Sequence, residues 1–464
     1  MEFRLIKKLK DRGRWRIFKL KLIDARLYFV SIFVGLLTGL IAVPYHYLLQ
    51  FFFNLRHDFF DSHPKWYWYL PLFLLMWGIL IFVSWLVKKM PLITGGGIPQ
   101  TRGVINGRVA YKHPFIEVIA KFVGGILALS TGLSLGREGP SVQIGSYVGC
   151  LVSKWGRVLA GERKQLLAAG AGAGLAAAFA APLASSLLVI ESIERFDAPK
   201  TAITTLLAGV VAGGVASWLF PINPYFQIDA IVPGMTFWSQ VKLFLLLAAV
   251  VSVFGKFFSV TTLQVKRIYP AIKHPEYVKM LYLLFIAYLI SMAEVNLTGG
   301  GEQFLLAQAM HPDTHILWIV GMMLLHFVFS TFSSSSGLPG GSFIPTLVTG
   351  GLLGQIVALI LVQQGVIAYE NISYIMLICM SAFLVAVIRT PLTAIVLITE
   401  ITGHLEVFYP SIVVGGLTYY FTEMLQIKPF NVILYDDMIN SPAFKEEARY
   451  TSVSYTHLTL PTKA

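Results

Sequence analysis

The chain has 464 residues, of which 56% are hydrophobic and only 13% charged, and its formal net charge is +12. With a mean hydropathy of +0.70, this composition excludes a soluble globular protein and indicates a polytopic membrane protein. The two cysteines, Cys150 and Cys379, lie far apart in apolar stretches. They predict neither a disulfide framework nor a zinc site, and we expect no metal and no cofactor.

The chain begins with a basic segment, residues 1–26, which carries ten Lys or Arg against three acidic residues. The positive-inside rule therefore predicts a cytoplasmic N-terminus. We interpret this segment as an amphipathic helix that touches anionic membrane lipid, and not as an arm that binds nucleic acid. Because the segment opens with charge and not with a short apolar core, no cleavable signal peptide is expected.

Long apolar runs follow, many of them near the ~20 residues that a membrane-spanning helix needs. They cover residues 28–53, 68–88, 117–135, 166–190, 202–219, 239–260, 278–297, 315–332, 346–362, 372–388 and 408–425. The runs lack the alternation of apolar and polar residues that a β-barrel requires, so we predict an all-α multispanning protein. A short segment, 426–464, ends the chain; its polar, Thr-rich end is expected to be disordered, and whether that end is native is left open.

Three sequence patterns occur twice, in the same order. TGGG stands at 94–97 and again at 298–301, an offset of 204 residues. The glycine–proline spacing that begins at Gly136 begins again at Gly341, and Pro182 and Pro391 are each followed nine residues later by a glutamate. Matches in one order at nearly constant offset predict two related halves, residues 27–220 and 230–425.

Glycine and proline interrupt both halves at matching positions, in GREGP at 136–140 and GSFIP at 341–345. Such breaks place half-length helices near the middle of the membrane, at the interface between the halves. The first N–H groups of a helix have no partner within it, and the positive end of the helix dipole attracts an anion or a carboxylate. The pattern therefore predicts an anion site made by two helix N-termini.

Glu138 is an acidic residue within this otherwise apolar region. Placed at the predicted helix N-termini, its ionised carboxylate would take the place of an anion, and its protonated form would lose that attraction. We therefore predict that Glu138 is both a gate and a proton carrier. A structural ion pair with Arg137 is the simpler alternative, although adjacent residues do not face each other on a helix.

The motifs TGGGIP at 94–99, GREGP at 136–140, AAAFAAPLASSLLVIES at 176–192 and GSFIP at 341–345 together resemble the CLC family of chloride channels and chloride/proton antiporters. The resemblance covers about residues 28–431. It implies a homodimer with one pore in each subunit, two halves of inverted topology and many tilted helices of uneven length. It also implies transport of chloride or a similar small anion, with protons as the second transported ion.

The resemblance also implies roles for individual residues. The outer gating glutamate falls on Glu138, and the backbone amides of the central anion site fall on Ser342 and Phe343. Amides near Arg137, Gly139 and Ile344 would belong to the outer anion site.

This sequence departs from the family pattern at three places. Gly96 stands where the family usually has a serine that contacts the central anion, so chloride preference is open. Glu191 and Ser192 mark a candidate inner proton path, but Ser192 stands where many antiporters have a second glutamate that passes protons inward, and serine does not titrate near neutral pH. We expect Glu191 to be a structural carboxylate bonded by nearby backbone or hydroxyl groups, with the proton path as the alternative. The family's pore tyrosine aligns with Asn431, while Tyr435 would take its place after a small shift.

We expect a chloride/proton antiporter in a bacterial inner membrane, with an uncoupled anion channel as the alternative. A cation-coupled solute carrier and an intramembrane hydrolase, using His326 and the run 333–336, are more remote alternatives. Two ion pairs are expected to be structural, one between Arg389 and Glu400 and one between Lys121 and Glu117.

Overall fold

The structure is a computed structural model that describes residues 2–62, 65–156, 158, 160–194, 199–219, 226, 228, 230–313, 315–426, 428–442 and 444. Side chains within the first 24 residues and all of 445–464 lie outside what it describes. The predicted lipid contacts of the basic segment and the expected disorder of the tail therefore fall outside the described residues.

Within the described ranges the chain folds into helices joined by short turns. The α-helices are α1 (Glu2–Asp61), α2 (Tyr69–Lys89), α3 (Ile98–Ile105), α4 (Pro114–Ser130), α5 (Glu138–Trp155), α6 (Ala160–Phe179), α7 (Pro182–Leu188), α8 (Pro199–Leu219), α9 (Phe237–Ile268), α10 (Glu276–Ala293), α11 (Glu302–Met310), α12 (Ile316–Ser335), α13 (Phe343–Gln363), α14 (Ile372–Ile388), α15 (Pro391–Thr402), α16 (Phe408–Met424) and α17 (Phe430–Ile439). A π-helical segment, Val189–Glu194, follows α7. Eight of the described helical segments are long and apolar enough to cross a membrane. The prediction of an all-α integral membrane protein is confirmed.

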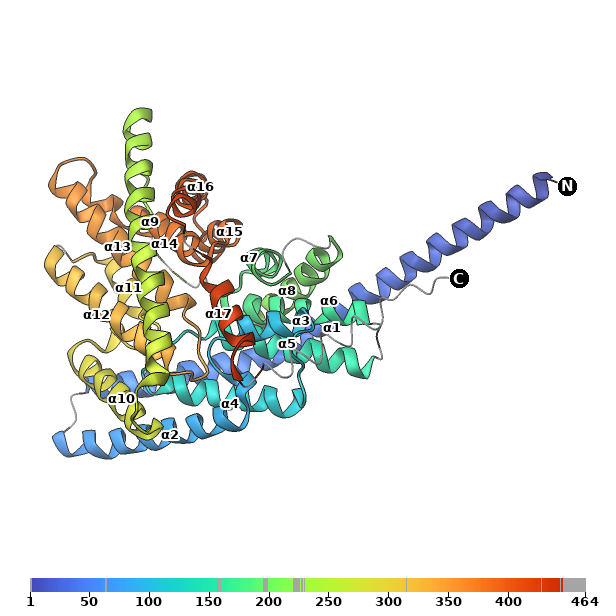
Figure 1. The fold of residues 1–464 in the computed structure, drawn as a ribbon. Coiled ribbons are helices and arrows are strands. Elements are labelled where there is room, and N and C mark those ends of the chain that lie inside the picture. The colour runs from blue at the N-terminus through green and yellow to red at the C-terminus, as the bar shows by residue number, and fades with distance from the viewer. Residues whose placement is uncertain are drawn as a thin grey trace.

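Figure 1 shows how the two halves of the chain are arranged. Helices of the first half, blue to green, lie mostly on one side of the molecule, and those of the second half, yellow to orange, lie mostly on the other. Helix α17, drawn in red, lies between them and contacts α3. The basic segment continues into the first apolar run as one helix, α1.

The repeated TGGG sequences adopt the same backbone conformation in both halves. The last glycine of each, Gly97 and Gly301, has a positive φ, 84° and 79°, and caps a short helix, α3 or α11. L-residues with a side chain rarely adopt this conformation, so the sequence requires glycine there. The repeat detected in the sequence is thus a repeat of local structure; the boundaries 27–220 and 230–425 stay predictions.

The apolar run at 166–190 contains a break between two helices. Helix α6 ends at Phe179, Ala180 takes a positive φ of 53°, and α7 begins at Pro182. Proline lacks the N–H that an uninterrupted helix would need at this position, and its ring clashes with the preceding turn. The break creates a short helix, α7, and α15 is its short counterpart in the second half, whereas α13 is long and apolar enough to cross a membrane.

Helices α5 and α6 pack with their backbones in direct contact. A Cβ atom added at Gly145 would collide with the carbonyl of Gly170, and one added at Gly170 would collide with the carbonyl of Gly145. Small residues at such crossings are the usual means by which membrane helices approach closely. The crossing holds the helix that begins at Glu138 against the body of the first half.

We predict that Gly145→Ala lowers stability by about 1–3 kcal/mol, because the added methyl group meets backbone that cannot move aside without separating the helices. Thermal unfolding of the purified protein in detergent measures the effect. Gly78→Ala in α2 is the matched control, since a Cβ there has no neighbour within 4 Å. Equal melting temperatures for the two variants would contradict the proposed backbone contact.

Candidate functional site

Backbone hydrogen bonds join the glycine motifs of the two halves. The amide of Gly136 donates to the carbonyl of Gly341 at 2.7 Å, and the amide of Gly341 donates back to Gly136 at 2.7 Å. A second pair of bonds connects Gly95 with Gly337 at 3.2 Å and with Gly340 at 3.1 Å. The first pair of bonds joins residues 205 positions apart in the chain, and the second joins residues 242 and 245 positions apart, so both connect the two predicted halves.

Two helices of opposite halves begin beside this bridge. Helix α5 begins at Glu138 and α13 begins at Phe343, with Arg137 and Ser342 as their N-cap residues. Neither cap residue bonds its helix through a side chain. The first amides of both helices are therefore available to a negatively charged group, and both dipoles present their positive ends to it.

The Glu138 side chain lies at the N-terminus of the opposite helix. It is fully buried, and its Oε1 accepts hydrogen bonds from the amides of Phe343 at 2.9 Å and Ile344 at 3.3 Å. A Cβ atom at Gly136 would collide with this carboxylate. A side chain at position 136 would therefore displace the carboxylate from this place, where it accepts hydrogen bonds from the first amides of α13.

Most of the predicted anion-site residues line one cavity of about 570 Å³. Its predicted members are Gly96, Glu138, Gly139, Ser342, Phe343 and Asn431. Lys266 and Arg267, in the last turn of α9, line the same cavity, where Arg267 pairs with Asp437 at 3.7 Å. The sequence analysis missed these two residues; the available signal was a basic pair that ends a long apolar helix.

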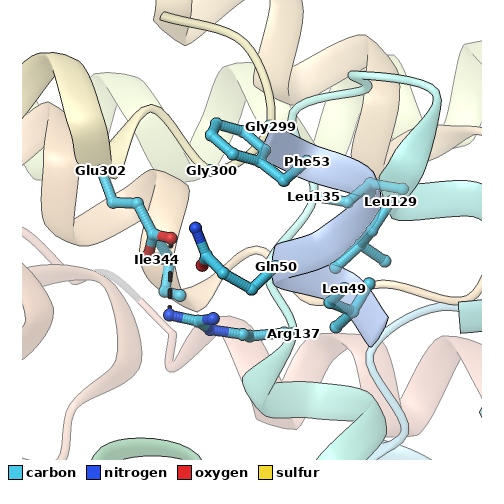
Figure 2. Close-up of a pocket in the computed structure, with 10 residues that line it drawn as sticks. All are labelled: Leu49, Gln50, Phe53, Leu129, Leu135, Arg137, Gly299, Gly300, Glu302 and Ile344. Carbon is cyan, nitrogen blue, oxygen red and sulfur yellow. Dashed lines mark hydrogen bonds and ion pairs between the residues drawn. The ribbon is translucent and has the colours of Figure 1, made fainter. Parts of the chain in front are cut away.

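The two remaining predicted residues, Arg137 and Ile344, line a different and smaller cavity, shown in Figure 2. The Arg137 guanidinium pairs with Glu302 at 3.4 Å, so its ionic partner there comes from the second half of the chain. Since Ile344 lines this cavity and its amide donates to Glu138, which lines the larger one, Glu138 lies between the two cavities.

Two of the positions that depart from the family pattern contact each other. The amide nitrogen Nδ2 of Asn431 lies 3.4 Å from Oγ of Ser192. Both residues line a third cavity of about 510 Å³, and Asn431 also lines the large one. Tyr435 packs its ring against the Arg102 guanidinium, 4.7 Å from the ring centre. The structure therefore places Asn431 beside the cavities and Tyr435 against α3.

Glu191 caps a helix of the other half. Its carboxylate accepts hydrogen bonds from the amides of Leu392 at 3.1 Å and Thr393 at 2.8 Å, and from the Thr393 hydroxyl at 2.6 Å. These groups form the first turn of α15. Backbone and hydroxyl groups thus bond Glu191 as a structural carboxylate, which is the role expected for it from the sequence in place of a proton path.

Glu400 makes the symmetry-related contact. Its carboxylate accepts hydrogen bonds from the amides of Leu183 at 3.0 Å and Ala184 at 2.8 Å, in the first turn of α7. The expected ion pair between Glu400 and Arg389 is therefore wrong, because Arg389 instead pairs with Glu423 at 2.7 Å. Each half thus supplies a carboxylate that caps a half-length helix of the other.

Lys121 is a buried cation that the sequence analysis assigned to the wrong partner. Its Nζ donates to the carbonyls of Ile93 at 2.8 Å and Gly95 at 2.6 Å, whereas Glu117 accepts the amide of His113. The expected pairing of Lys121 with Glu117 fails because the lysine side chain turns inward, toward the backbone of the first glycine motif. Its Nζ bonds the backbone that directly precedes Gly96.

The serine run at 333–336 ends α12 and bonds mainly to its own helix. The hydroxyls of Ser334 and Ser335 donate to the carbonyl of Thr331, and Ser333 accepts the amide of Ser134. No hydrogen bond between these serines and His326 is found among the described residues. The geometry therefore gives no support to the hydrolase alternative, and the described part holds no cluster of three metal-ligating side chains.

Comparison with known proteins is consistent with this geometry. Residues 78–423 match a family described as Voltage gated chloride channel. The H(+)/Cl(-) exchange transporter ClcA of Vibrio cholerae is 31% identical over 430 residues, which cover 86% of this chain and 87% of that protein. ClcA of Klebsiella pneumoniae is 29% identical over 439 residues, covering 90% and 89%.

Solved structures show the same fold. That of a slow cyanobacterial Cl-/H+ antiporter superposes with a TM-score of 0.81 at 26% identity, covering 90% of this chain and 99% of its own. That of a CLC-type fluoride/proton antiporter gives a TM-score of 0.70 at 21% identity, covering 86% and 96%, a likeness of fold alone.

We predict that Glu400→Ala lowers stability by about 1–3 kcal/mol, because it leaves two amides at the start of α7 without an acceptor. Thermal unfolding in detergent measures the loss, and Glu400→Gln, which keeps one acceptor oxygen, should lose less. Glu406→Ala is the control, since that side chain is 56% exposed. A melting temperature for Glu400→Ala equal to that of the control would rule out a stabilising cap.

Proposed function

This chain belongs to the voltage-gated chloride channel family, and from that premise we propose that it exchanges chloride for protons across a membrane, with Glu138 as its gate. The observation that carries the proposal is the pair of amide bonds from Phe343 and Ile344 to the Glu138 carboxylate. The carboxylate stands in for the permeant anion, because it carries the same charge and accepts hydrogen bonds as a halide does. The protein is then a transporter and not an enzyme.

The exchange cycle follows from the two charge states of Glu138. Ionised, the side chain is held by two amides and two helix dipoles and blocks the passage between the cavities. Protonated, it loses most of that attraction, leaves the helix N-terminus, and an anion binds the amides instead. When the anion leaves, protonated Glu138 releases its proton, and the resulting carboxylate binds the amides again. One side chain thereby couples the two ions.

The inner side of the proton route differs from the family pattern. Glu191 is engaged as a cap of α15, and Ser192 has no proton to exchange near neutral pH. We propose that water in the cavities on either side of Asn431 carries protons to Glu138. The absence of a titratable residue at 192 favours the second candidate, an uncoupled anion channel of the same family.

The remaining assignments follow the family. We propose that two copies form a homodimer with one anion pathway in each, embedded in lipid of a bacterial inner membrane. The basic segment 1–26 places the N-terminus in the cytoplasm and lies against anionic lipid. On this orientation the cavity beside Lys266 faces the cytoplasm, and the cavity beside Glu302 faces outward.

We predict that Glu138→Gln abolishes proton movement while anion flux persists, because glutamine keeps the size of the side chain but cannot titrate. Purified protein in liposomes, with a pH indicator and a chloride electrode, measures both fluxes. Proton movement that survives in this variant would exclude Glu138 as the carrier.

The reversal potential of the wild-type protein under opposed chloride and pH gradients separates the two candidate functions. A value displaced from the chloride equilibrium potential identifies an antiporter, and a value equal to it identifies a channel. Absence of any anion flux would reject both.

We predict that Gly96→Ser raises the preference for chloride over nitrate, because it adds a hydroxyl donor to the cavity that Gly96 lines. Gly96→Ala is the matched control: it adds the same Cβ, 3.2 Å from the Cα of Gly341, without the hydroxyl. Relative permeabilities measured in liposomes decide the matter. If serine and alanine shift them equally, the hydroxyl has no role.

A further inference from the structure

An ion pair between the two halves lies on the outward side of the gate. Arg137, the N-cap residue of α5, reaches Glu302, the first residue of α11, with 3.4 Å between Nη2 and Oε1. Both side chains are largely buried, at 14% and 18% exposure. Figure 2 shows them pointing toward each other across a cavity, with the amide of Gln50 beside them.

The cavity itself is small and mostly apolar. Its volume of about 50 Å³ exceeds the roughly 10–15 Å³ that one water molecule needs, but it is far smaller than the cavity of 570 Å³ on the other side of the gate. Leu49, Phe53 and Leu135 form part of its wall. In such a narrow apolar space, a single charge is poorly screened by water and acts strongly on its neighbours.

Glu302 acts on the position that the anion would occupy. Glu302 lines the same cavity as Ile344, and the amide of Ile344 donates to the Glu138 carboxylate, so a negative charge on Glu302 repels negative charge held at that amide. The Glu138 carboxylate accepts the amides of Phe343 and Ile344, and an anion bound at the same amides would carry its charge to the same place. Glu302 must therefore repel that anion as well, and it also pairs with the guanidinium of Arg137, the N-cap residue of the helix that begins at Glu138.

Resting on the function proposed above, we infer that Glu302 is an affinity-determining residue of the outer anion site. By placing a fixed negative charge beside Arg137, it weakens anion binding at the start of α13 and thus limits how firmly an anion competes with Glu138. It contacts neither the anion nor the transported proton; it acts through the electric field at the site.

Replacement of the charge alone tests this role. Glu302→Gln keeps the shape of the side chain and a hydrogen-bond acceptor for Arg137, and we expect it to bind chloride more tightly by on the order of tenfold. Glu302→Asp keeps the charge and should remain within about twofold of the wild type. Glu370→Gln, an exposed carboxylate outside the cavity, is the control for loss of a surface charge and should leave the affinity unchanged.

Isothermal titration of each purified protein with chloride gives the affinities, and chloride efflux from liposomes gives the fluxes. If the wild-type protein releases chloride from liposomes but Glu302→Gln binds chloride with the same affinity as the wild type, the inference is overturned and the proposed function stays intact. An affinity gained equally by the Glu370 variant would also overturn it. Tighter binding only in Glu302→Gln supports it, even if wild-type efflux proves absent; failure of every form to bind chloride would reject both proposals.

Discussion

The structure depends on two helix N-termini being held together at one point inside the protein. Glycine backbone makes this possible: Gly136 and Gly341 bond to each other, and neither can carry a side chain without colliding with Glu138. The first amides of α13 have no acceptor within their own helix, and they donate instead to the carboxylate of Glu138 in the other half. Everything inferred about anion binding follows from that arrangement, since no lysine or arginine is needed in direct contact with the ion.

Much of this could be predicted from the sequence, because it follows from backbone chemistry. The glycines of TGGG predict positive φ values, and GREGP and GSFIP predict helix starts with unpaired N–H groups. Their repetition predicts that the helix starts of the two halves meet. Long apolar runs predicted the membrane-spanning helices, because a helix that crosses a membrane needs ~20 apolar residues. The left-handed conformation of Ala180, which separates α6 from α7, could not be predicted, because alanine has no preference for it.

Side-chain partners were harder to predict, since they depend on contacts across the fold. Proximity along the chain suggested that Lys121 pairs with Glu117 and Arg389 with Glu400, and both suggestions failed. Lys121 instead satisfies backbone carbonyls, and Glu400 caps a helix more than two hundred residues away. Sequence spacing identified Glu191 and Glu400 as equivalent positions, but only the folded structure shows that each serves the opposite half.

The reciprocal caps have a consequence for how the two halves can evolve. Glu191 lies in the π-helical segment that follows α7, Glu400 lies in the last turn of α15, and each bonds the first turn of the short helix of the other half. A change in one half alone, such as a shorter turn after α7 or a shifted start of α15, leaves unbonded amides in its counterpart. Recombination that exchanges one half for that of a distant relative should therefore succeed only when the glutamate and its target turn are inherited together.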